Sequence, residues 1–204
     1  LTSLLDLQLY NNTLSGALST QLATLTNLET LIVHSNKLTG TIPTELGQLT
    51  SLLDLQLYNN TLSGALSTQL ATLTNLETLI VHSNKLTGTI PTELGQLTSL
   101  LDLQLYNNAL SGALSTQLAT LTNLEYLYLH SNKLTGTIPT ELGQLTALQV
   151  LSVNNNSLTG TLPTELGQLI NLLLLTVEIN KLTGPLPTEL GRLTALLELR
   201  IFNN

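Results

Sequence analysis

Histidine and tyrosine are the residues of this chain with the most versatile chemistry, and most of them are evenly spaced. They alternate every 24 residues, at Tyr10, His34, Tyr58, His82, Tyr106 and His130. An imidazole can act as a general base, a metal ligand or a pH-sensitive contact, and a tyrosine ring is an amphipathic contact surface. Which role applies depends on the groups that the fold places beside each ring.

The even spacing follows from an internal repeat of 24 residues. Residues 1–48 and 49–96 are identical, residues 97–144 differ from them at four positions, and residues 145–192 are a diverged copy. Each 48-residue block holds two units with the pattern L-x-x-L-x-x-L-x-L-x-x-N-x-L-[ST]-G-x-[LI]-x-x-x-L. Eight units and a partial ninth fit this pattern, which predicts one domain over 1–204 with no recognisable N- or C-terminal cap.

The element L-T-G-x-[IL]-P occurs in residues 38–43, 86–91, 134–139 and 158–163. It makes the chain resemble the plant-type leucine-rich repeat of receptor-kinase ectodomains and polygalacturonase-inhibiting proteins. The resemblance implies an α/β-type solenoid, a right-handed superhelix with a parallel β-sheet on its concave face and short 3-10 or helical turns on its convex face. The cysteine-bearing caps of that class are missing here, so we expect terminal leucines to meet water.

The pattern within a unit explains how such a fold forms. Leu7 and Leu9 point inward from a short strand, and Asp6 and Gln8 point outward. Asn12 and its equivalents are expected to form a ladder that binds backbone groups of the loops. A glycine follows at the next tight bend, and a threonine before Gln or Glu suits the N-cap of the convex turn.

The strand register places three columns of side chains on the face of the sheet that points away from the core. This is the concave face of the solenoid, and we call it the sheet face. Its candidate ligand-binding residues in the first column are Asp6, Asp54, Asp102 and Tyr126. Those in the second column are Gln8, Ile32, Gln56, Ile80, Gln104, Tyr128 and Arg200, and those in the third are Tyr10, His34, Tyr58, His82, Tyr106, His130 and Phe202. The other members, including Val150, Ser152, Thr176 and Glu178, are also expected to face outward.

Rigid aromatic side chains on such a face are typical of interfaces, so the leading hypothesis is a module that binds a protein or peptide, with a neutral or basic partner favoured by the acidic face. Cross-strand stacking that only stabilises the sheet is the alternative interpretation of the rings. In that case the chain is a duplicated or consensus-built scaffold without a selected ligand.

A further alternative is ice binding through a row of eight threonines spaced 24 residues apart, from Thr20 to Thr188. Uncapped ends would also allow end-to-end self-association.

Catalysis and metal binding are not expected from these columns. Asp6 and His34 fall about 13 Å apart at ~3.3 Å per residue, beyond the hydrogen-bond reach that a triad needs. No outward serine lies near a histidine in the identical blocks. Histidines on alternate strands stand about 10 Å apart, too far for one tetrahedral ion. We therefore predict a non-enzymatic protein without a cofactor or metal.

Composition limits the partners and the compartment. The 13 acidic and 6 basic residues give a net charge of −7, which argues against a nucleic-acid surface. No apolar run approaches the ~18 residues of a membrane-spanning helix, so membrane insertion is not expected. No signal peptide is visible, and the absence of cysteine leaves the compartment open. Glycosylation sequons at Asn11, Asn59 and Asn155 and the family resemblance favour an extracellular or secreted location.

Overall fold

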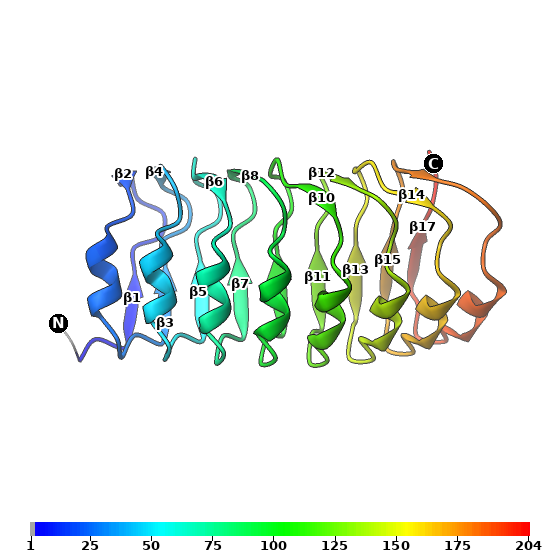
Figure 1. Ribbon diagram of the computed structural model, residues 1–204, viewed down its shortest axis with the longest axis horizontal. Coiled ribbons are helices and arrows are strands. Elements are labelled where there is room, and N and C mark those ends of the chain that lie inside the picture. Colours follow the sequence, from blue (N-terminus) through cyan, green and yellow to red (C-terminus); the bar gives the residue numbers. More distant parts are fainter. Residues whose placement is uncertain (1–2) are drawn as a thin grey trace.

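One parallel sheet of nine strands runs along the array in the computed structural model, which describes residues 3–204. Its strands are β1 (Asp6–Gln8), β3 (Thr30–Ile32), β5 (Asp54–Gln56), β7 (Thr78–Ile80), β9 (Asp102–Gln104), β11 (Tyr126–Tyr128), β13 (Val150–Ser152), β15 (Leu174–Thr176) and β17 (Glu198–Arg200). Neighbouring strands pair without offset, with Asp6 beside Thr30 and Gln8 beside Ile32. The predicted solenoid and its register are confirmed (Figure 1).

Eight 3-10 helices of five residues lie on the side of the array opposite the sheet (Figure 1). They are η1 (Thr20–Thr24), η2 (Thr44–Gln48), η3 (Thr68–Thr72), η4 (Thr92–Gln96), η5 (Thr116–Thr120), η6 (Thr140–Gln144), η7 (Thr164–Gln168) and η8 (Thr188–Arg192). The prediction that threonine caps these helices is wrong. Ser19 caps η1 by accepting from the Gln21 amide, and Pro43 precedes η2 without a side-chain cap, so the threonine is the first helical residue.

Short strands on one flank form four two-stranded sheets that the repeat pattern did not predict. The pairs are β2 (Ser15–Ala17) with β4 (Lys37–Thr39), β6 (Ser63–Ala65) with β8 (Lys85–Thr87), β10 (Ser111–Ala113) with β12 (Lys133–Thr135), and β14 (Thr159–Gly160) with β16 (Lys181–Leu182). Each pair joins an odd unit to the even unit after it, and the bend at Gly16 in β2 has φ +84°. The flank therefore has the 48-residue period.

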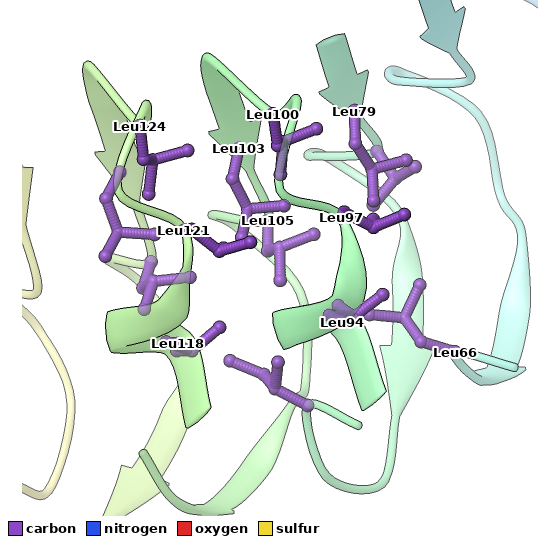
Figure 2. Packing of buried hydrophobic residues seen from close by; sticks show 14 of the residues in the cluster. Leu66, Leu79, Leu94, Leu97, Leu100, Leu103, Leu105, Leu118, Leu121 and Leu124 are labelled. Atoms are coloured by element: carbon purple, nitrogen blue, oxygen red, sulfur yellow. The ribbon is translucent and has the colours of Figure 1, made fainter. Parts of the chain in front are cut away.

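The core is a continuous column of leucines between the sheet and the helical turns (Figure 2). Leu103 and Leu105 come from the strand segment, and Leu94 and Leu118 come from two successive helices; all four are fully buried. Leu9 is 37% exposed although its equivalent Leu57 is fully buried, because Leu9 has no unit before it. The expectation that terminal leucines meet water is confirmed, and a unit's leucines are buried by its neighbours.

The predicted asparagine ladder is present and connects each unit from the second onward to the one before it. Asn108 donates from Nδ2 to the carbonyl oxygens of Val81 and Leu105 at 3.2 and 3.1 Å. Its Oδ1 accepts the Leu86 amide at 3.0 Å. Backbone groups that leave the strand ladder at the bend are thereby satisfied inside the protein.

The residue before each ladder asparagine has a left-handed backbone, with φ between +52° and +57°. Asparagine or serine occupies this position in every unit except the eighth, where Ile179 has φ +54°. A β-branched residue is strained in this region because its Cβ approaches the backbone. The Ile179 side chain is 45% exposed, so burial offsets little of that strain.

Replacing Asn108 with alanine should lower the free energy of unfolding by about 2 kcal/mol, because the Leu86 amide loses its acceptor. The carbonyls of Val81 and Leu105 also lose one of their two side-chain donors and keep the other, from Asn84 and Asn132. Chemical denaturation measures this loss. Asn123→Ala is the control, since exposed Asn123 makes one bond to the Thr98 carbonyl. Equal losses in the two variants would contradict the role given to the ladder.

Replacing Ile179 with asparagine should raise the free energy of unfolding by about 1 kcal/mol, because asparagine tolerates the left-handed backbone. Ile170 is also an exposed isoleucine but has no positive φ, so Ile170→Asn should bring no gain. The same denaturation experiment compares them. A gain that is equal in both variants would show that lost surface hydrophobicity, and not relief of strain, is the cause.

Candidate functional site

The sheet register brings the predicted columns together as expected over the first six strands. Asp102 lies beside Tyr126, and Gln104 lies beside Tyr128, on the paired strands β9 and β11. The expectation that every column member faces solvent is wrong over β13 and β15, where Val150, Ser152 and Thr176 are buried. Glu178 is only 4% exposed. These small side chains are buried because larger side chains lie beside them on the neighbouring strands.

Six rings of the third column form a continuous stack across the sheet face. Tyr10, His34, Tyr58, His82, Tyr106 and His130 follow one another with ring centroids 4.0 to 5.0 Å apart. Their planes differ by 20° or less. The ring faces thus contact each other, and the stack presents its edges outward. This is the geometry of the stabilising cross-strand interpretation.

Burial in the stack favours the neutral form of the histidines. It lowers the pKa of His34 and His130, and it lowers the pKa of His82 to about 4, with the neighbouring histidine charges as further causes. The Tyr106 hydroxyl lies 3.1 Å from His82 Nε2, and His82 Nδ1 lies 3.0 Å from Ser83 Oγ. A neutral ring satisfies both contacts when the tyrosine donates to Nε2 and Nδ1–H donates to the serine.

Tyr126 and Tyr128 lie outside this stack. Tyr128 meets Tyr106 and His130 edge to face at 6.3 Å, so its own ring has no stacked partner among the described residues. The Tyr126 hydroxyl donates to Gln149 at 3.3 Å. Burial raises the pKa of the Tyr128 hydroxyl, with Asp102 and Tyr126 as smaller causes. These two tyrosines are absent from the identical blocks, and no described ring is stacked on either of them.

Two carboxylates of the sheet face have a buried oxygen with no hydrogen-bond partner among residues 3–204. They are Asp102, through Oδ1, and Glu178, through Oε2. The other oxygen of Asp102 accepts from Gln104 at 2.8 Å. Burial raises the pKa of Asp102, and the charge of Asp54 raises it further, whereas the hydrogen bond from Gln104 lowers it. A buried acceptor without a donor costs free energy, so both sites favour a donor from outside the chain.

Glu178 belongs to a hollow of about 240 Å³ at the C-terminal end of the sheet face. Its lining residues are Tyr128, His130, Ser152, Asn154, Leu174, Thr176, Glu178, Glu198 and Arg200. The hollow forms because the side chains of Ser152 and Thr176, at its bottom, are smaller than those of Tyr128 and Arg200 on either side. Of these lining residues the sequence had singled out Tyr128, His130 and Arg200, and it gave no signal for the others beyond the change from the identical blocks.

The expectation that no serine lies near a histidine in the identical blocks is wrong, since Ser35 Oγ lies 3.1 Å from His34 Nδ1 and Ser83 Oγ lies 3.0 Å from His82 Nδ1. Another serine and histidine meet in this hollow. Ser152 Oγ lies 3.1 Å from His130 Nδ1 and donates to Asn154 Oδ1 at 2.9 Å. Because the serine proton points to Asn154, the histidine is the donor in the first contact. Thr176 also donates to Ser152 Oγ at 2.9 Å. In this arrangement the histidine does not take the serine proton, as a general base would.

The remaining predicted site residues lie apart from the hollow or at its rim. Arg200 forms an exposed ion pair with Glu198 at 2.5 Å, and Phe202 is exposed. The sequon asparagines Asn11, Asn59 and Asn155 are exposed at the left-handed position of the bend. Among residues 3–204, no group of three or more His, Cys, Asp or Glu side chains could hold a metal ion, and no helix is long and apolar enough to cross a membrane.

Two larger hollows of about 560 and 570 Å³ lie on the flank and are copies of each other. The first is lined around residues 41–45 and the second around residues 89–93. Glu45 and Glu93 are their only charged residues, and neither has a buried unpartnered oxygen. The larger volume of these two hollows favours the flank as a binding surface. The buried carboxylate oxygens without a hydrogen-bond partner, however, lie on the sheet face.

Family models agree with this geometry. Residues 27–49 match the Leucine Rich Repeat, residues 74–134 match a second leucine rich repeat model, and residues 122–166 match a model of two such repeats. This chain belongs to the leucine-rich-repeat proteins. No curated protein matches it.

Among solved structures, this leucine-rich-repeat chain is similar to the Arabidopsis receptor kinase HAESA in complex with the peptide hormone IDA and the co-receptor SERK1. The identity is 33%, the match covers 95% of this chain and 32% of that one, and the TM-score is 0.92. A leucine-rich-repeat protein of Leptospira interrogans is 41% identical, over 98% of this chain and 49% of that one, with a TM-score of 0.82. A plant ice-binding protein is 30% identical, over 86% and 64% of the two chains, with a TM-score of 0.67. The chain spans about a third of the plant receptor structures that it matches.

The histidine stack predicts that stability falls as the pH drops from 6.5 toward 4. His82 has a pKa of about 4 when folded against an ordinary value of 6.5, so in this window the unfolded chain binds a proton that the folded chain does not. The stabilisation is full above pH 6.5 and is lost progressively below it. Since the ring is only partly buried, we expect a loss on the order of 1 kcal/mol after solvent screening.

Urea unfolding of wild type and His82→Phe at about pH 7.5 and about pH 5 measures this loss. The phenylalanine keeps a ring in the stack and should show a smaller loss between the two pH values. The raised pKa of Asp54 and Asp102 acts with the opposite sign, and both variants retain these groups. The same pH dependence in both proteins would rule out His82 as a cause.

Proposed function

We propose that the chain is a non-enzymatic module that binds a peptide or an extended protein segment across its sheet face. The observation that carries the proposal is the pair of buried carboxylate oxygens on this face, Asp102 Oδ1 and Glu178 Oε2, that have no donor among the described residues. An extended peptide carries backbone and side-chain donors along its length and can reach both. The solved plant receptor in complex with a peptide hormone supports this function by analogy.

The charge of the face favours a basic partner. Asp6, Asp54 and Asp102 occupy the first column on alternate strands, and the whole chain has a net charge of −7. Carboxylates arranged in a row attract a cationic segment and repel an acidic one. An extracellular setting, as in the receptor ectodomains that the chain resembles, belongs to the same proposal.

Ice binding through the threonine row is the alternative that the similar ice-binding protein brings forward. All eight threonines from Thr20 to Thr188 are exposed. The hydroxyls of Thr44, Thr92 and Thr140, however, donate to the carboxylate of the glutamate that follows each of them at 3.2 Å. Hydroxyls held by exposed carboxylates form a charged row, and we therefore place this function second.

Selection from a phage-displayed random peptide library tests the binding function. Enriched peptides should be basic, and their affinity should fall by about tenfold or more for Gln104→Arg, which places a cation on the sheet face. Gln96→Arg adds the same charge to exposed η4 and is the matched control, with unchanged affinity expected.

Three outcomes contradict parts of the proposal. Equal affinity for both variants would move the site to the flank or the helical turns. A failure to enrich any peptide would favour a scaffold without a selected ligand. Inhibition of ice recrystallisation by the same preparation would favour the threonine row.

A further inference from the structure

We infer that the hollow over β11 to β17 is a subsite for one cationic side chain, a lysine or arginine, of the bound segment, with Glu178 as its counter-charge. This inference rests on the proposed function, because it names the chemistry of the partner at one place on the sheet face.

The size of the hollow suits a single side chain. Its volume of about 240 Å³ is below the ~300 Å³ at which pockets for whole small ligands begin. It lies on an open sheet face along which a longer chain can continue in both directions. A residue of an extended segment can therefore insert its side chain while the backbone stays above the rim.

The charge of the hollow calls for one positive group. Glu198 and Arg200 neutralise each other through their ion pair, and burial lowers the pKa of His130, which favours its uncharged form. The remaining charge is that of Glu178. A single cation thus balances the lining residues.

Glu178 is not explained by the fold. Every other unit holds an aromatic ring, a histidine or an asparagine at this position of the third column. The residue is only 4% exposed, and its Oε2 is buried without a hydrogen-bond partner among the described residues. Burying an unpaired carboxylate opposes folding. The terminal torsion of a glutamate is broad, so the carboxylate can turn toward a donor that enters the hollow.

The other walls complete a site for a long side chain with a cationic end. Leu174 offers an apolar surface to methylene groups. Tyr128 has an unstacked ring face, to which a cation is attracted. Thr176 donates its proton within the floor network, and its oxygen keeps a lone pair for a further donor. Carboxylate, ring and hydroxyl together recognise an ammonium or guanidinium group.

Titration of isotope-labelled protein at pH 7 with N-acetyl-lysine N-methylamide, followed by NMR, tests the inference. Ring signals of Tyr128 and His130 and amide signals of Ser152 and Thr176 should shift and saturate, with a Kd on the order of 1 mM for a ligand of this size. N-acetyl-norleucine N-methylamide has the same stem without the amine and should cause no saturable shift. The arginine analogue decides which cationic group fits better.

Glu178→Gln should weaken the lysine probe roughly tenfold, as expected for loss of a charge-assisted bond. Its thermal midpoint should equal or exceed that of wild type, whereas a carboxylate with only a structural role would lower it when removed. Glu165→Gln removes the same charge from η7 and should change neither affinity nor midpoint.

Equal shifts by the lysine and norleucine probes in wild type would overturn the inference without any variant. Equal lysine affinity in wild type and Glu178→Gln would overturn it as well. The titration reads the hollow directly and needs no selected peptide. A negative titration beside a positive library selection would therefore remove the cationic subsite and leave the binding face in place. A positive titration beside a failed selection would keep the subsite and remove the peptide function.

Discussion

Burial of each unit's leucines by the next unit is the constraint on which the rest of the structure depends. A 24-residue unit has too few apolar side chains to enclose itself, so Leu9 is exposed where it lacks a neighbour and Leu57 is fully buried where it has two. Stacking with a constant step forces the strands into register, and the asparagine ladder satisfies the backbone where each strand ends. The packing of the core therefore determines the sheet face, because residues at the same position of successive units fall into one column.

This constraint explains why the fold could be predicted from the sequence in detail. Leu7 and Leu9 define the inward positions, and the ladder position of Asn108 follows from the period, so the strands of the main sheet, its columns and the ladder were correctly placed. The short strands on the flank were not predicted. Features that depend on side-chain volume were not predictable in the same way. Thr176 and Ser152 are buried because Tyr128 and Arg200 stand beside them, and no pattern within one unit records its neighbours' size. Threonine was wrongly expected to cap the helices, because it is the first helical residue and the cap position before it holds a serine in η1 and a proline in η2.

The sheet face divides into two parts with different chemistry. Over the identical blocks, tyrosine and histidine rings contact one another face to face, and His82 has both ring nitrogens within hydrogen-bond distance of a partner. The faces that these rings turn toward each other are closed to a ligand. Over the diverged units the stack ends at His130, a hollow opens, and Glu178 is buried without a donor. Ile179 beside it has a strained backbone. Groups that cost stability are concentrated where we place the ligand.

Photo-crosslinking locates the ligand most directly. A library-selected peptide that keeps its cationic side chain and carries a diazirine on the residue next to it would be bound to the wild-type chain, irradiated, and its adducts mapped by mass spectrometry. The account predicts adducts within residues 128–130, 150–154, 174–178 and 198–200, in the four units that line the hollow. Adducts concentrated within residues 41–45 or 89–93 would place the ligand on the flank and contradict it.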